Sequence, residues 1–232
     1  MCSILIAFHL FESVPIIVAA NREERFDRPA APPQIQDGRV RYIAPRDLEA
    51  GGTWIGCTEY GRIVALANRF DGPEGEDSRG NLVSELLRTK STAKVQETVR
   101  KQIRSKSYAG FNLLIADPDK AVAYVWDGEF IARDLGHGMH VIVNGGIGLQ
   151  NAKGAILQAR IHAPAYSSES EWRDRAKSVL KAHGNRVCVH ESMRGTRSSS
   201  VITVATDRTI RYEFANGPPC ETSYRPIYEG EL

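Results

Sequence analysis

The sequence contains few cysteines and no local cysteine pair. Four are present in 232 residues, all far apart: Cys2, Cys57, Cys188 and Cys220. A Cys-x-x-Cys motif or a dense, evenly spaced set would indicate a metal site or a disulfide framework. We therefore expect neither structural zinc nor disulfides, and assign no metal-ligating residue.

The sequence also lacks an excess of charge of either sign. Thirty basic residues stand against twenty-eight acidic ones, a formal net charge of +2, and the two signs are interspersed. Binding to nucleic acid or to an anionic membrane surface usually requires a concentrated basic patch. The composition therefore predicts no nucleic-acid partner, and the partner that we expect is a small-molecule amide or a hydrophobic ligand.

Long apolar runs and nucleotide motifs are missing as well. The first apolar stretch, residues 3–8, has no basic segment before it and is interrupted by His9, Glu12 and Pro15, unlike a signal peptide or transmembrane span. The sequence has no phosphate-binding loop, dinucleotide glycine fingerprint or His-Glu-x-x-His motif. We expect a cytoplasmic protein with no transmembrane segment.

The composition is that of a globular chain with a sizeable core, 42% hydrophobic and 25% charged. At this length, and without a visible linker, it predicts a single domain over residues 1–232.

Hydrophobic patterns predict strands and helices in separate blocks. Residues 3–8 and 16–20 form a predicted hairpin, residues 28–38 a loop too rich in proline to pair centrally in a sheet, and residues 40–43, 53–58 and 63–67 three further strands. Two helices follow, over apolar positions 83–87 and 95–103. The chain then continues with a four-stranded meander (111–116, 121–126, 130–133, 139–143), helices over 153–162 and 170–183, and a final hairpin (201–205, 210–214).

This segregated order is typical of an α+β protein with antiparallel sheets covered by helices, not of a doubly wound parallel sheet. So many strands fit two sheets stacked between two helical layers.

Cys2 stands immediately before the first predicted strand. If Met1 is removed, one residue carries a thiol of pKa about 8.5 and an amine of pKa about 7.7–8.0, so proton transfer between them is nearly thermoneutral. Such a residue can act as a nucleophile with its own base. The alternative is that Cys2 is an inert apolar residue at the start of a buried strand.

Four polar residues at predicted strand ends are candidates for the rest of a site. Arg22 follows the strand at 16–20, Asn68 and Asn144 follow two others, and Arg197 precedes the strand at 201–205. Amide and guanidinium donors fixed at strand ends can face a developing oxyanion. The alternative is that each is an ordinary capping or solvated turn residue.

Several motifs together resemble the NRDE family, the family of transport and Golgi organisation protein two. They are the N-terminal Met-Cys, Asn21-Arg22-Glu23-Glu24, residues 51–56, Asn68-Arg69 and residues 195–199, with further likeness at 78–80 and 110–114. The resemblance implies an N-terminal-nucleophile hydrolase fold, a four-layer αββα sandwich like that of penicillin V acylases and bile salt hydrolases.

The resemblance also implies residue roles. Cys2 would be the nucleophile, Arg22 would orient its thiol and amine, Asn68 and Asn144 would hold the oxyanion and substrate, and Arg197 would complete the polar shell. We further expect Glu23, Trp54 and Arg69 to contact the substrate. Glu23 departs from the family pattern, which has an aspartate after the arginine, so its carboxylate lies on a longer side chain.

These observations lead to one principal function and two alternatives. The principal one is hydrolysis of a C–N amide bond of an unknown small substrate through a thioester on Cys2, with no required cofactor. The first alternative, also implied by the resemblance, is a non-catalytic haem- or lipid-binding or trafficking protein, in which Cys2 or His9 could contact iron in the same pocket. The second is a papain-type enzyme that uses Cys57 or Cys188 with a histidine.

Overall fold

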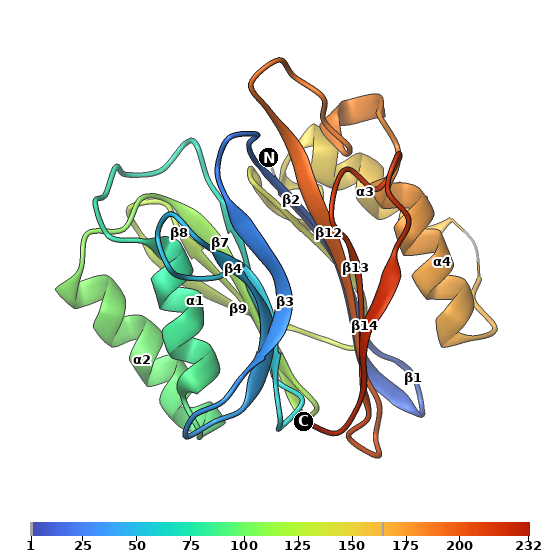
Figure 1. The fold of residues 1–232 in the computed structure, drawn as a ribbon, viewed down its shortest axis with the longest axis horizontal. Coiled ribbons are helices and arrows are strands. Elements are labelled where there is room, and N and C mark those ends of the chain that lie inside the picture. The colour runs from blue at the N-terminus through green and yellow to red at the C-terminus, as the bar shows by residue number, and fades with distance from the viewer. Residues whose placement is uncertain (1, 164) are drawn as a thin grey trace.

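In the computed structural model, which describes residues 2–163 and 165–232, the strands form two seven-stranded antiparallel sheets (Figure 1). The first sheet has the order β11-β10-β1-β2-β12-β13-β14 and the second β3-β4-β5-β6-β7-β8-β9. The first comprises β1 (Ser3–Phe11), β2 (Val14–Arg25), β10 (Gly138–Val143), β11 (Gly146–Ile147), β12 (Arg194–Val204), β13 (Ile210–Ala215) and β14 (Arg225–Gly230). The second comprises β3 (Ala30–Gln36), β4 (Tyr42–Asp47), β5 (Ile55–Thr58), β6 (Ile63–Asn68), β7 (Phe111–Asp117), β8 (Lys120–Trp126) and β9 (Phe130–Leu135).

Helices cover the outer face of each sheet. Helices α1 (Arg79–Arg88) and α2 (Thr92–Ser105) pack on the second sheet, and α3 (Ala152–His162) and α4 (Glu169–Leu180) on the first (Figure 1). Two short 3₁₀ helices, η1 (Gly148–Gln150) and η2 (Gly184–Arg186), complete the described elements. The predicted α+β sandwich of two stacked sheets between helices is confirmed.

Strand β1 shows why the apolar pattern specifies this stacking. Ile4, Ile6 and Phe8 point into the core between the sheets, and Leu5 and Ala7 point into the core under α3 and α4. Successive side chains of a strand alternate between faces, so a strand buried on both sides is a continuous apolar run. Such a run therefore marks a strand with a sheet on one side and helices on the other.

Two polar segments that were expected to be loops belong to the central strand pair of the first sheet. Strand β2 continues through residues 21–25, and β12 begins at Arg194 rather than at Val201. The two strands pair from Ile16 and Val204 to Arg25 and Arg194. This long ladder satisfies the backbone groups of both polar segments, so pairing overrides their local preference for turns.

The second sheet corrects two further predictions. Residues 28–38 do not form a loop throughout, because β3 pairs with β4 at the sheet edge, with a register shift between Ala31 and Gln34 at the two prolines. An edge strand tolerates proline because one side of its backbone needs no partner. The predicted four-stranded meander has three strands, since β10 leaves the second sheet to pair with β1.

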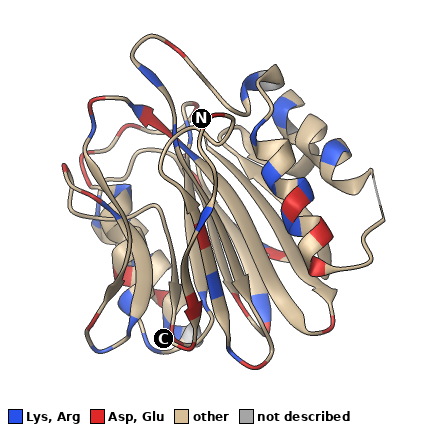
Figure 2. Ribbon diagram, turned by 45° about the vertical axis from the view of Figure 1, so that its right-hand side comes forward, with Lys and Arg blue, Asp and Glu red and all other residues tan. Residues whose placement is uncertain are grey.

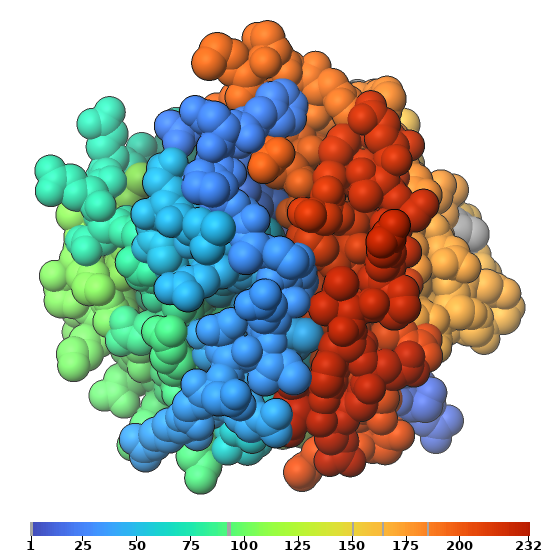
Figure 3. Space-filling view, in the orientation of Figure 1, coloured from blue at the N-terminus to red at the C-terminus, as the bar shows by residue number. Residues whose placement is uncertain are grey.

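Strand β14 was not predicted, and α4 ends at Leu180, three residues before the expected end. Strands β3 and β14, the outer strands of the two sheets, lie side by side on one face of the molecule (Figure 3).

Basic and acidic residues are distributed over both sheets, their connections and the helices, as the interspersed sequence predicts (Figure 2). Among the described residues, no helix combines the length and apolar character needed to cross a bilayer. The longest, α2, has 14 residues, whereas a span needs about 20.

Candidate active site

A cavity of about 290 Å³ lies at the end of the sandwich where β1 and β5 begin and β2, β4 and β6 end, next to the start of α1. Five of the predicted site residues line it: Cys2, Arg22, Glu23, Trp54 and Asn68. They come from both sheets, so the cavity exists only because the sheets stack.

The β1–β2 hairpin brings Cys2 and Arg22 together. Its register pairs Ser3 with Asn21, and one more step along the strands places Cys2 beside Arg22. Directly opposed residues of antiparallel strands share a face, and this is the inner face that also carries Ile4 and Ala20. The predicted hairpin therefore aims the thiol and the guanidinium at the same space.

Arg22 is held in place by acids and by an aromatic ring. Its Nη2 donates to Oδ2 of Asp47 at 3.0 Å and lies 3.8 Å from Glu24, and its guanidinium carbon lies 4.1 Å from the centre of the Trp54 ring. Burial lowers the pKa of Arg22, while Glu24, Asp47 and Cys2 act in the opposite direction. Arg22 is thus a fixed cation close enough to Cys2 to interact with a thiolate.

Asp47, which the sequence reading missed, organises this part of the site. Its Oδ2 also accepts from Nε of Arg28 at 2.7 Å, and its Oδ1 accepts the backbone N–H groups of Glu49 and Ala50, each at 3.0 Å. Burial raises the pKa of Asp47, but the hydrogen bonds from Arg28 and Ala50 and the two guanidinium charges outweigh it and hold the pKa below its usual range.

A second arginine, also missed, approaches from the start of α1. Arg79 is the first residue of this helix, lines the cavity and donates to the carbonyl of Gly110 at 2.9 Å. Burial lowers its pKa, with Cys2 and Glu24 opposing this. A cation in the first turn opposes the helix dipole. This unfavourable placement is the sequence signal that could have identified Arg79.

Gly52 explains how α1 reaches the cavity. A Cβ at this position would lie 2.2 Å from the carbonyl carbon of Gly80 and 2.5 Å from the nitrogen of Asn81, both in the first turn of α1. The neighbouring N–H of Thr53 donates to the Gly80 carbonyl at 3.1 Å. Only glycine permits this approach, which accounts for part of the glycine-rich motif at residues 51–56.

Glu23 is buried beside a lysine. Burial raises the pKa of Glu23 to about 7, although Lys153, whose Nζ lies 3.4 Å from Oε1, lowers it. This carboxyl group therefore titrates near neutral pH. Glu23 also borders a second depression of about 410 Å³ formed with Phe70 and Val189.

Asn144 supports Asn68 and does not line the cavity. Its Nδ2 donates to the backbone carbonyl of Asn68, and the backbone carbonyls of Val143 and Asn144 accept from Nδ2 of Asn112 at 2.6 and 3.3 Å. These bonds join β6 and β7 of the second sheet to the end of β10 in the first. Asn112, fully buried on β7, was missed because it looks like an interruption of an apolar strand.

Arg69 also lies outside this cavity. Its Nη2 is 2.7 Å from Asp71 and 3.7 Å from Asp127, and its Nη1 donates to Oδ1 of Asn112 at 3.3 Å. These contacts fix the loop that leaves β6, and substrate contact by Arg69 stays a prediction.

Arg197 is part of β12, not of a turn before it. It occupies a register shift between Thr196 and Ser198, and Ser198, not Arg197, pairs with Arg22. Arg197 is not among the described residues that line the cavity, so its role in the polar shell stays a prediction.

Two residues of the alternatives, His9 and Cys57, can now be placed. His9 lies at the far end of β1, seven residues or about 23 Å from Cys2 along the strand, where its Nε2 contacts the Pro118 carbonyl at 2.6 Å. It therefore cannot serve the same pocket as Cys2. Cys57 is wholly buried, which raises its pKa far above the usual range and disqualifies it as a nucleophile. The removal of Met1 concerns a residue outside the described part of the chain.

Solved structures with a similar fold include an acylase and a bile acid hydrolase. Penicillin V acylase from Agrobacterium tumefaciens aligns with a TM-score of 0.57 and 13% identity, over 97% of this chain and 86% of that one. A variant of conjugated bile acid hydrolase from Clostridium perfringens aligns with a TM-score of 0.63 and 11% identity, over 98% and 92%. At these identities the likeness establishes the fold alone.

Sequence comparison gives closer relatives. The Transport and Golgi organization protein 2 homolog of Bos taurus is 25% identical over 239 residues, covering 85% of this chain and 84% of the bovine one. The Mus musculus homolog is 32% identical over 107 residues, 44% of this chain but 38% of the mouse protein. The profile of the family described as Transport and Golgi organisation 2 matches residues 1–214. The chain therefore belongs to this family, in agreement with the resemblance seen in its motifs.

Proposed function

We propose that this chain is a cysteine-dependent N-terminal-nucleophile amidohydrolase. The observation that carries the proposal is the cavity in which Cys2 shares a strand face with Arg22 and is approached by Arg79. The fold shared with acylases and a bile acid hydrolase supports it.

The proposed reaction begins with removal of Met1, which frees the amine of Cys2. The amine accepts the thiol proton, and the thiolate attacks the amide carbonyl, forming an S–C bond and an oxyanion. Collapse of this intermediate breaks the C–N bond, and the departing nitrogen takes the proton. Water then attacks the thioester, releases the carboxylic acid and restores the thiol.

The cavity offers donors for the oxyanion. Asn68, Arg79 and Gly80 all line this cavity, so the amide of Asn68, the guanidinium of Arg79 and the first N–H groups of α1 are the candidate donors. A well-placed oxyanion donor is worth about 3–4 kcal/mol of transition-state stabilisation. Arg22, clamped between Asp47 and Trp54, holds a positive charge on the strand face that carries the attacking sulfur.

The lining of the cavity favours a small polar substrate. Eight of its eighteen lining residues carry ionisable charge, three arginines and five acidic residues. Its volume of about 290 Å³ is at the lower end of the range of about 300–1,000 Å³ for small-molecule sites.

We place the reaction in the cytoplasm, where thiols stay reduced, because all four cysteines are free.

The test is covalent labelling with a small β-lactone, followed by intact-mass measurement and peptide sequencing. Ring opening by a thiol adds the whole lactone, because no group leaves. We expect a chain shorter by one methionine that gains one lactone at Cys2, and no labelling of the Cys2→Ala variant. Cys57→Ala is the matched control and should label at the wild-type rate. A retained Met1 with an unlabelled Cys2 would refute the proposal.

One observation favours the haem- or lipid-binding alternative. Phe70, which is 61% exposed, borders both the depression of about 410 Å³ beside Glu23 and another of about 340 Å³ beside Asn144. Together they could receive an apolar ligand. Neither a histidine nor a cysteine is among the described residues that line these two depressions, so an axial ligand would have to come from Cys2 in the adjoining cavity, which shares Glu23 with the first depression. A Soret shift on haem titration that is lost in Cys2→Ala supports this alternative, and an unshifted Soret band rejects haem.

A further inference from the structure

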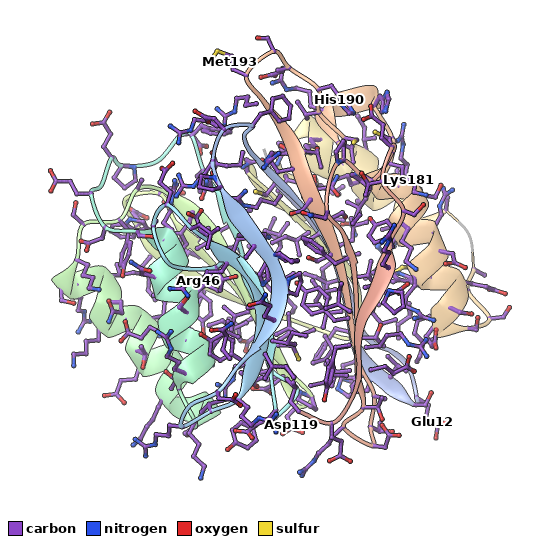
Figure 4. All side chains as sticks on the ribbon, viewed as in Figure 1. Glu12, Arg46, Asp119, Lys181, His190 and Met193 are labelled. Carbon is purple, nitrogen blue, oxygen red and sulfur yellow. The ribbon has the colours of Figure 1, made fainter. Side chains whose placement is uncertain are left out.

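Four potential metal ligands come together away from the Cys2 cavity. They are His183, Cys188, His190 and Cys220, and one ligand atom from each lies within 4.8 Å of all the others. Three belong to the connection between α4 and β12, and Cys220 belongs to the connection between β13 and β14. Figure 4 shows His190 at the same end of the molecule as Met193, opposite Glu12 and Asp119.

The spacing of three of these atoms, those of Cys188, His190 and Cys220, is within about 0.4 Å of tetrahedral corners around one ion. Zinc binds sulfur at about 2.3 Å and imidazole nitrogen at about 2.0–2.1 Å, so tetrahedral corners are about 3.8 Å apart for two sulfurs and about 3.5 Å for sulfur and nitrogen. Here the two sulfurs lie 3.4 Å apart, and Nε2 of His190 lies 3.6 Å from Cys188 and 3.1 Å from Cys220. His183 closes the cluster, with its ring centre 5.1 Å from that of His190.

We propose that these residues bind one zinc ion in a closed, structural Cys₂His₂ site. Two sulfurs and two imidazole nitrogens in a tetrahedral arrangement are the ligand set that selects zinc among common divalent ions. Binding releases the two thiol protons, and the resulting thiolates neutralise the ion. Four protein ligands complete its coordination, so the site is structural and not catalytic.

The surroundings of the cluster hold its ligands in place. The N–H of Cys188 donates to the Ala182 carbonyl at 2.8 Å, and His190 forms a β-bridge with Gly195. Oε1 of Glu221 lies 3.9 Å from Nδ1 of His190, on the side of the ring away from the cysteines. An outer carboxylate on this side of the ring would orient a metal-bound histidine once it moved to hydrogen-bond distance.

The site would join two connections that are remote in the sequence. Cys188 and Cys220 are 32 residues apart, which is why their spacing gave no metal motif, and the antiparallel strands β12, β13 and β14 return the chain to the same place. Cys220 lies beyond the residues matched by the family profile. Val189, between two of the ligands, lines the depression beside Glu23, so the ion would stiffen one wall of that depression.

The experiment uses the full chain without a histidine tag, reduced and freed of metal. Titration with Co²⁺ should give the intense visible bands of tetrahedral cobalt and thiolate-to-cobalt charge transfer, saturating at one ion per chain, and Zn²⁺ should abolish both. His183→Ala and Cys220→Ser should lose the bands, and Glu221→Gln should weaken Zn²⁺ binding by roughly 10- to 100-fold. Cys2→Ala and Cys57→Ala, which remove thiols elsewhere, should titrate like the wild type.

Three outcomes would overturn the proposal. One is a reduced, folded wild-type chain that gives no thiolate-to-cobalt bands. Another is a His183→Ala variant, at an exposed position expected to fold normally, that binds Co²⁺ as the wild type does. The third is a purified chain in which a disulfide joins Cys188 and Cys220 and which does not bind zinc after that disulfide is reduced.

Discussion

Replacing Asp47 by asparagine tests whether this carboxylate is the electrostatic centre of the Cys2 cavity. The substitution keeps the shape of the side chain and one oxygen, which can still accept the N–H groups of Glu49 and Ala50. It removes the negative charge that Arg22 and Arg28 share at Oδ2 and turns an amide nitrogen, which cannot accept their hydrogen bonds, toward both of them. We expect a folded but clearly less stable protein.

The expected loss follows from the burial of the two arginines. Breaking a buried ion pair by removing one partner costs about 3–5 kcal/mol, because the other charge stays buried. The side chain of Arg22 is only 5% exposed, but that of Arg28 is 23% exposed and can be rehydrated, and Glu24 stays within 3.9 Å of both. We therefore expect a loss of about 3 kcal/mol in the free energy of unfolding.

Urea unfolding at pH 7 measures this loss. With a slope of about 2–3 kcal/mol per molar, the midpoint should fall by roughly 1–1.5 M. Glu49→Gln is the matched control: it removes an exposed carboxylate that also pairs with Arg28, at 3.2 Å, and should cost under about 1 kcal/mol. Asp47→Asn with a shift no larger than that of Glu49→Gln would refute the reasoning.

The same variant has a predicted pH dependence. The folded pKa of Asp47 is lowered, so its carboxylate stabilises the fold above its unfolded pKa of about 3.9, and this contribution is lost as the pH falls through the folded value. The difference between wild type and Asp47→Asn should therefore shrink in acid. A difference that stays constant down to the acid transition would contradict this assignment.

Three further predictions concern neighbouring features. The pKa of Glu23 rises from 4.5 to about 7 on folding, so wild-type stability should fall as the pH rises through that interval. Glu23→Gln should lose this dependence when thermal unfolding is measured at pH 5 and pH 8, and equal pH dependence in both proteins would contradict the raised pKa. Arg79→Ala should slow β-lactone labelling of the N-terminal thiol by roughly 10²-fold. Arg46 has an exposed side chain, so Arg46→Ala should label at the wild-type rate, and equal rates for the two variants would exclude Arg79 from the site. Gly52→Ala should destabilise the fold by about 1–3 kcal/mol or more. Gly136 has open space around it, so Gly136→Ala should leave stability unchanged, and equal melting temperatures for the two variants would show that α1 can move away from residue 52 without loss of stability.

Local pattern was sufficient for most elements of the fold. The continuous apolar run of residues 3–8 marked a strand buried on both faces, and the β1–β2 hairpin followed from the turn at residues 12–13. Two of the failures of local pattern have a common cause. Residues 21–25 and 194–200 are polar and look like turns, yet each satisfies its backbone groups by pairing with the other strand, which no local pattern reveals.

The sequence by itself determined the separate blocks of strands and helices, the position of Cys2 before a buried strand and its placement beside Arg22, because alternation and hairpin register act between near neighbours. Only the tertiary structure decided that Asp47 and Arg79 reach the same cavity, that Asn144 stands behind Asn68, and that two cysteines 32 residues apart meet two histidines. These contacts depend on which sheets stack and which edges pair. That choice is made by burial summed over the whole core, and so leaves no signature in any short stretch of the chain.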